Sequence, residues 1–151
     1  MSLLSISHAN PSVEEDIASY RAAHYCIEPA GIPAVILRIG ERSAGLASLY
    51  GKLGVDSIAF LTASNPLGVA LRDADNAVAL KALCADVHAM GLALMPGVTR
   101  DGDPASGWPG EESIAILGIS RDAACRLGNR YQQNAVVWAG SDAVPGLVRL
   151  R

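Results

Sequence analysis

VDSIAFLTASNP (Val55 to Pro66) decides the fold of this chain, because an apolar run stops there abruptly on polar residues. Ile58 to Leu61 is continuously apolar and too short for a buried helix, which predicts a strand buried on both faces. Pro66 cannot donate to a strand ladder and disfavours helical backbone at Asn65, so the strand must end first. Ligands gather at the carboxyl ends of strands in open α/β sheets, which makes Thr62 to Asn65 a candidate site. The alternative is a tight turn that satisfies only its own backbone.

The residues before this stretch predict another strand and a helix. Ile32 to Ile39 is rich in β-branched residues, which favours a strand at the centre of the sheet. Ser43 can cap the helix that follows, and Gly54 can end it. Strand, helix and strand then predict a right-handed βαβ unit with parallel strands.

Caps and periodicity predict the remaining elements. Ser12 and Glu15 form a capping-box pattern for an opening helix, and the alternating residues Tyr25 to Glu28 can form a short edge strand. Downstream we expect a long helix from Asp73 or Asp75 to Gly91, strands over Leu92 to Val98 and Ile114 to Ile119, a helix capped by Ser120, and a hairpin of Ala135 to Ala139 with Leu147 to Leu150. Together they predict one α/β domain, residues 1–151, with a mixed, mostly buried sheet flanked by about four helices.

Composition excludes several classes of protein. Half of the 151 residues are hydrophobic, and the formal net charge of −3 gives no attraction for nucleic acid or anionic membrane. We expect no membrane-spanning helix and no secretory signal, because the apolar runs are too short. Cys26, Cys84 and Cys125 lack CxxC spacing and are typical of the reduced core thiols of a cytoplasmic protein.

No motif identifies a reaction. The three histidines lack zinc-binding spacing, and neither a Gly-rich phosphate loop nor a GxSxG elbow occurs. Asp101 and Asp103 could gather a hard cation with Glu111 and Glu112, although acidic residues in a loop of this kind are usually only solvated. We therefore predict no metal site, and the sequence identifies no cofactor.

Three polar features are nevertheless candidates for a site. The long turn-rich segment Thr99 to Gly110 leads to Glu111, and an indole close to that carboxylate, from Trp108, would raise its pKa toward the range of a general acid or base. Asn76 lies either on the inward face of the first turn of the long helix or at its N-cap. Gln133 and Asn134 could recognise a polar ligand or satisfy the loop backbone.

A series of short motifs runs through most of the chain: Tyr20, Tyr25, LRIGE (Leu37 to Glu41), FLTASNP (Phe60 to Pro66), Asn76, WPGEES (Trp108 to Ser113), LGI (Leu117 to Ile119) and QNAVVW (Gln133 to Trp138). In this order the series resembles the DUF3293 family, small bacterial proteins of unknown function. The resemblance implies no reaction, cofactor or partner. It marks as motif positions Thr62, Asn65, Pro66, Asn76, Trp108, Glu111, Ser113, Gln133 and Asn134. Gln132 stands where a Gly commonly precedes QNA, which calls into question any role that needs close backbone approach there.

Two functions fit these residues. The first is a small-polar-ligand-binding protein or hydrolase-like enzyme, with Glu111 as the acid, base or ligand-orienting carboxylate and Trp108 as a wall. Its hydrogen-bonding shell would be Thr62, Asn65, Asn76, Ser113, Gln133 and Asn134. The second is a non-enzymatic regulatory or protein-interaction module, anchored to a protein partner by Trp108 and its loop. A recess shared by Glu111 and the amides favours the first, and a flat apolar patch around Trp108 favours the second.

Overall fold

In the computed structural model, which describes residues 17–66, 70–108 and 110–151, the strands form a seven-stranded sheet in the order β2-β1-β4-β5-β3-β6-β7. The strands are β1 (His24–Ile27), β2 (Val35–Leu37), β3 (Ile58–Leu61), β4 (Leu94–Arg100), β5 (Glu111–Leu117), β6 (Ala135–Ala139) and β7 (Gly146–Arg149). All neighbouring pairs are antiparallel. The predicted α/β class and mostly buried sheet are confirmed, whereas the sheet is antiparallel rather than mixed.

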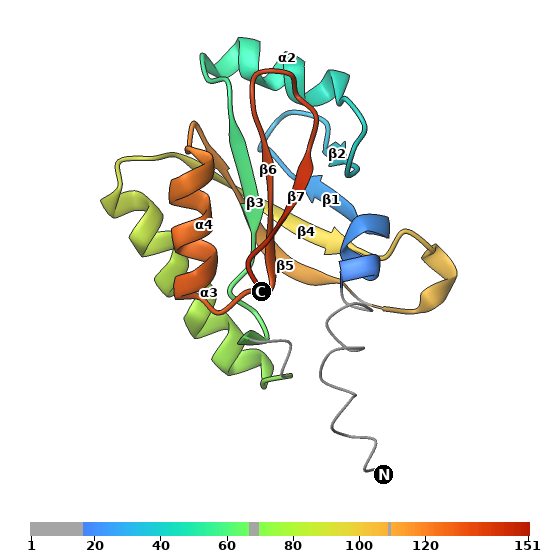
Figure 1. Ribbon diagram of the computed structural model, residues 1–151, viewed down its shortest axis with the longest axis vertical. Helices are drawn as coiled ribbons and strands as arrows, with labels where there is room; N and C mark the ends of the chain where they lie inside the picture. The colour runs from blue at the N-terminus through green and yellow to red at the C-terminus, as the bar shows by residue number, and fades with distance from the viewer. Residues whose placement is uncertain (1–16, 67–69, 109) are drawn as a thin grey trace.

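The helices lie largely as predicted. They are α2 (Ala44–Leu53), α3 (Asp73–Ala89) and α4 (Arg121–Arg130), and residues 17–22 are also helical. Ser12 and Glu15, the predicted start of the opening helix, lie outside the described residues. In Figure 1, α3 and α4 lie on one side of the sheet, and α2 lies across one end. No described helix has both the length and the apolar character needed to cross a membrane.

The predicted place of the 32–39 strand is wrong. β2 has only three residues and forms an edge of the sheet, with Ile36 53% exposed. β1, predicted as an edge strand, instead lies between β2 and β4. Three strands separate β2 from β3, so the parallel βαβ unit does not form. The physical reason is local: residues 28–34, which include Gly31 at φ 74°, let β2 fold back on the neighbouring β1 without a crossover.

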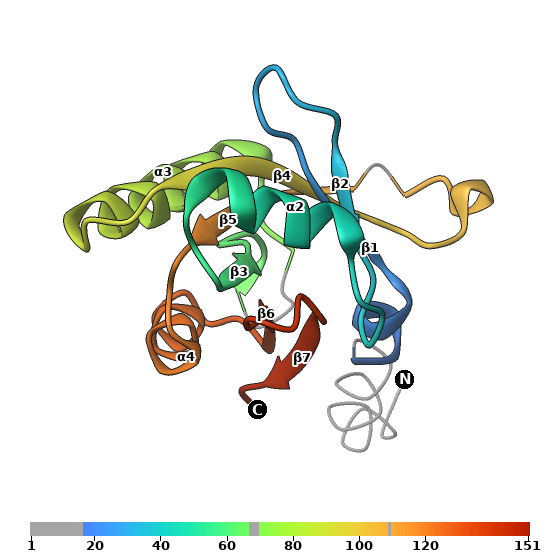
Figure 2. The ribbon, with the colours of Figure 1, turned by 90° about the horizontal axis from the view of Figure 1, so that it is seen from above.

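Two hydrophobic cores cover the two faces of this sheet. One packs β1, β2 and α2 against the inner face of β3 and β5, and the other packs α3 and α4 against the opposite face. The sheet is curled, and the loop after β2 is hydrogen-bonded to the loop between β6 and β7. The Gly40 amide donates to the Pro145 carbonyl at 2.8 Å, and the Ser43 amide donates to the Ala143 carbonyl at 2.9 Å. Figure 2 shows the resulting curl from above.

The α2 end of the sheet is closed by paired polar groups. The Ser43 hydroxyl caps α2 by accepting from the Leu46 amide at 3.0 Å, and Gly54 ends the helix at φ 69°, both as predicted. The Tyr50 hydroxyl lies within 2.9 Å of the Gly140 carbonyl and 3.2 Å of the Ala139 carbonyl, at the end of β6. α2 therefore seals the end of the curl where β3 begins and β6 ends.

Candidate functional site

The polar residues gather at the end of the sheet opposite α2. Because neighbouring strands are antiparallel, β3 and β4 finish at this end, and β5, β6 and β1 begin there. A cavity of about 390 Å³ opens at this end of the sheet. It is lined by Ser19, Tyr20, Ala22, Ala23, Ser64, Asn65, Thr99, Asp101, Trp108, Glu111, Gln133 and Asn134. Five residues predicted from the sequence share this cavity: Asn65, Trp108, Glu111, Gln133 and Asn134.

Asn65 joins the end of β3 to the start of β5. Its side-chain nitrogen donates to the Glu111 carboxylate at 3.4 Å, a long hydrogen bond. Its side-chain oxygen accepts from the Asn76 amide group at 2.9 Å and from the Leu71 backbone amide at 3.1 Å. The Asn65 backbone amide donates to the Asn76 side-chain oxygen at 2.9 Å. Four contacts thus hold Asn65 in its left-handed conformation, at φ 47°.

These contacts decide between the two predicted positions of Asn76. α3 begins at Asp73, with Arg72 as its N-cap, so Asn76 lies in the first turn and is not the cap. Its amide faces the loop after β3 and forms two hydrogen bonds with Asn65. Asn76 is not among the residues that line the cavity, so it acts on the site by holding Asn65.

Glu111 is the most perturbed carboxyl group of the site. Burial raises its pKa to about 7, because removal from water disfavours the charged form, and the hydrogen bond from Asn65 opposes part of that rise. Tyr25 lines a small hollow together with Glu111, and its hydroxyl donates to the Tyr20 carbonyl at 2.5 Å. Burial also raises the pKa of the Tyr25 hydroxyl, and the nearby charges of Tyr20 and Glu111 add smaller contributions in the same direction. Glu111 can therefore donate or accept a proton near neutral pH.

Two other predicted ligand-binding residues have their hydroxyl groups engaged by the protein. The Thr62 hydroxyl donates to the Glu112 carbonyl at 2.7 Å and accepts from the Ser64 amide at 3.0 Å. The Ser113 hydroxyl lies 3.0 Å from the Thr99 hydroxyl and donates to the Glu111 carbonyl at 3.1 Å. Neither residue lines the 390 Å³ cavity. Both brace the start of β5, Thr62 at the Glu112 carbonyl and Ser113 at the Glu111 carbonyl.

The buried polar side chains of the cavity differ in whether they have hydrogen-bond partners. The Gln133 amide nitrogen donates to the Ser64 and Tyr131 carbonyls, each at 3.1 Å, and so closes one wall. Asn134 is 6% exposed and Ser64 is 7% exposed. Within the described part of the chain, the Asn134 amide and the Ser64 hydroxyl have no hydrogen-bond partner. Buried polar groups are nearly always paired, so these two are exceptional.

The backbone conformation at Gln132 explains why a glycine commonly stands at this position of the family pattern. It adopts φ 55° just after α4, where the Gln132 amide donates to the Asn129 carbonyl and the Gln133 amide donates to the Gly128 carbonyl. This is the helix-ending motif in which a left-handed residue, usually Gly, follows the last turn. The position therefore favours Gly for its backbone conformation, and Gln occupies it here at some cost.

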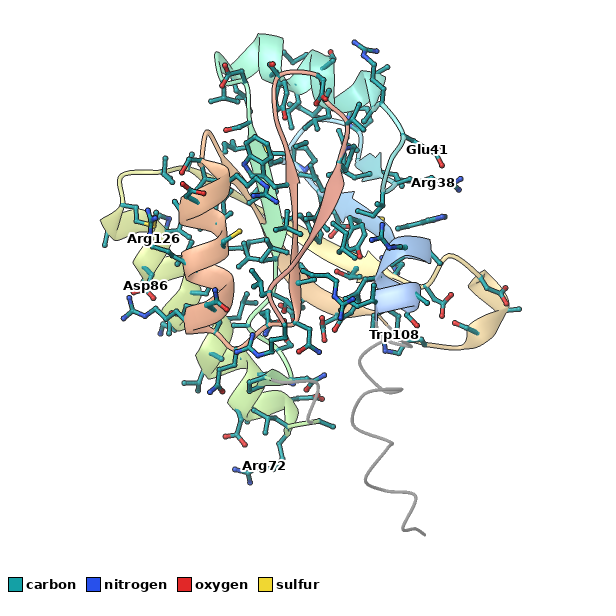
Figure 3. All side chains as sticks on the ribbon, in the orientation of Figure 1. Arg38, Glu41, Arg72, Asp86, Trp108 and Arg126 are labelled. Carbon is teal, nitrogen blue, oxygen red and sulfur yellow. The ribbon has the colours of Figure 1, made fainter. Side chains whose placement is uncertain are left out.

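Trp108 lies at the border of two hollows. It is 46% exposed and lines both the 390 Å³ cavity and a neighbouring hollow of about 480 Å³. In Figure 3 it lies beside the first helix, well away from Glu41 and Arg38. The indole therefore forms part of a wall and does not close the cavity completely.

The acidic residues of the long loop do not converge. Asp101 lines the cavity with Glu111, but Asp103 and Glu112 do not. Among the described residues, no group of three or more His, Cys, Asp or Glu side chains is placed to hold a metal ion.

Several cavity residues lie outside the predicted set of site residues, namely Ser19, Tyr20, Thr99 and Asp101. Asp101 lies in the loop that the sequence marked as polar, whereas Ser19 and Tyr20 belong to a helix whose direction no local pattern reveals. The pairing of β1 with β4 brings that helix to the site.

Comparison with known proteins supports the predicted family for about half of the chain. The family model described as "Protein of unknown function (DUF3293)" matches residues 61–136, which run from the end of β3 into the start of β6 and include most residues of the site. The motifs at Tyr20, Tyr25 and Leu37 to Glu41 lie outside that match. No curated protein and no solved structure matches the chain. The chain belongs to the DUF3293 family of proteins of unknown function.

Proposed function

We propose that this protein binds a small polar molecule in the 390 Å³ cavity. The observation that carries the proposal is the Asn134 amide, which is buried, lines the cavity and has no partner among the described residues. Because buried polar groups are nearly always paired, a molecule with a complementary hydrogen-bonding group fits this position. The volume also lies in the range of small-molecule sites.

Glu111 is the group that would orient this molecule. Its carboxyl group shares the cavity with Asn134 and Ser64, and it accepts a hydrogen bond from Asn65. A carboxyl group that titrates near pH 7 also suits a general acid or base. The hydrolase-like activity predicted from the sequence would use this same carboxyl group on the bound molecule.

A ligand-observed NMR screen of a mixed panel of cationic, neutral and anionic fragments tests the binding proposal. We expect hits that Asn134→Leu abolishes, because leucine fills the same space without an amide. Asn129→Leu, at an exposed position of α4, is the matched control and should keep the hits. Hits that survive Asn134→Leu, or no hits at all, would contradict the proposal.

The second candidate function is the protein-interaction module. Its support is that Trp108 and Leu71, 46% and 40% exposed, both line the 480 Å³ hollow. If Trp108 serves only a protein partner, Trp108→Ala should leave fragment binding unchanged. If it walls the cavity, the same variant should weaken fragment binding, and that result would favour the first function.

A further inference from the structure

Resting on that binding function, we propose that the cavity selects a small organic cation with N–H donors, such as an amidine, guanidine or amine, over neutral and anionic molecules of the same shape. The charged residues among those that line it are Asp101 and Glu111, both acidic. Lysine, arginine and histidine are absent from the lining residues described. A bound carboxylate or phosphate would therefore find repulsion and no ion pair, whereas a cation would find two opposite charges.

The acidic character continues beyond the cavity. The 480 Å³ hollow shares Ser64, Asn65, Trp108 and Glu111 with it, and adds the carboxylates of Asp73 and Glu112. Here too, none of the described lining residues is basic. The charged residues that line both hollows are thus acidic, an arrangement that attracts cations and disfavours anions.

The unpaired polar side chains indicate what else the ligand carries. Asn134 and Ser64, both more than nine-tenths buried, each offer the cavity an oxygen that accepts hydrogen bonds. Glu111 adds a carboxylate, which pairs best with a planar, forked donor. Tyr20 and Trp108 line the same space, and aromatic rings attract organic cations. A cation with several N–H groups matches all three acceptors, whereas a quaternary ammonium ion matches only the charge.

An isosteric trio of probes separates charge from shape: benzamidine is cationic, benzamide is neutral and benzoate is anionic. Binding to the full chain is measured by ligand-observed NMR titration above the pKa of about 7, where Glu111 is ionised. We expect benzamidine to bind at least about tenfold more tightly than benzamide. We expect no binding of benzoate at the same millimolar concentrations.

Variants assign the preference to Glu111. Glu111→Gln should weaken benzamidine binding by about tenfold or more and leave benzamide binding unchanged, so the two affinities converge. Glu41→Gln removes one exposed carboxylate far from Trp108 and should change neither. Circular dichroism checks that both variants are folded.

Failure of this inference differs from failure of the binding function. Equal or tighter binding of benzamide or benzoate, or a benzamidine preference that survives Glu111→Gln, would overturn the charge selection while the cavity still binds small molecules. Failure of all three probes also contradicts it. The mixed fragment panel decides separately whether the cavity binds small molecules at all.

Discussion

The two ends of the curled sheet are built on opposite principles. At the α2 end, polar groups are paired: Ser43 caps the helix, Tyr50 reaches two carbonyls, and the Ser57 hydroxyl donates to the Ile119 carbonyl at 2.8 Å. At the cavity end, Asn134 and Ser64 are buried without partners among the described residues. Left-handed backbone conformations at residues other than glycine occur at both ends, at Asn65 and Gln132 here and at Ala143 beside Ser43. The α2 end is arranged for stability, whereas the cavity end retains features that reduce it.

This difference separates residues that stabilise the fold from residues that are kept for ligand binding. Unpaired buried groups and a partly buried carboxyl group lower stability, and such features gather at functional sites. Substitutions at the α2 end should therefore destabilise the protein. Conservative substitutions at the cavity end should stabilise it and weaken ligand binding.

The largest effect is expected at the α2 end from Leu46→Ala. Leu46 is fully buried in the inner core, so the truncation should lower the free energy of unfolding by about 2–5 kcal/mol, measured by urea denaturation. Leu53→Ala, in the same helix but at a side chain that is 40% exposed, should change it by less than about 1 kcal/mol. Equal losses from the two variants would mean that α2 does not seal the core.

Glu111→Gln should act in the opposite direction at the cavity end. The pKa of Glu111 is about 7 in the folded protein against an ordinary value of 4.5, so the folded state holds its proton to higher pH. Between those values the free energy of unfolding of the wild type falls as pH rises, by at most about 3 kcal/mol. The Gln variant lacks this decline and should be more stable above pH 7.

Urea denaturation at several pH values measures this effect, and Glu112→Gln, at the exposed next residue, is its control. A decline in stability that persists in Glu111→Gln would show that another group is responsible.

Gln132→Gly should also stabilise the protein. The left-handed conformation costs a side chain about 1–2 kcal/mol, and glycine avoids most of that cost. Thermal unfolding should therefore show a higher Tm for Gln132→Gly, whereas Gln132→Ala, which keeps the strained conformation, should show little gain. A lower Tm for the glycine variant would mean that the Gln132 side chain makes a contact that stabilises the loop.

The smallest effect is expected from Tyr50→Phe, which removes one hydroxyl from the α2 end. We expect a loss of about 0.5–1.5 kcal/mol, because the Gly140 carbonyl loses a donor at 2.9 Å. Fragment binding at the far end should not change. A change in binding would show that the two ends are coupled, which would contradict their separation.

Local signals were sufficient where one segment determines its own structure. The apolar run ending at Pro66 predicted β3, Ser43 and Ser120 predicted the starts of two helices, and the last hairpin followed from its turn. These predictions succeeded because caps, turns and buried runs act within a few residues. The polar character of the segment after β3 was visible for the same reason.

Strand order could not be predicted in the same way. The run from Ile32 to Ile39 has the composition of a central strand, yet most of it lies outside β2, at the edge of the sheet. Composition reports how apolar a segment is but not which neighbour it pairs with. The nearby β1 was a closer partner than the distant β3.

The sequence by itself determined the polar residue types, the elements that carry them and the abrupt end of the apolar core at Thr62. Only the tertiary structure decided that Asn65 and Glu111, which are far apart in the chain, meet at 3.4 Å, and that Asn134 is buried without a partner among the described residues. The reason is that burial and pKa depend on which strands become neighbours. That choice depends on contacts across the whole sheet, which no single segment specifies.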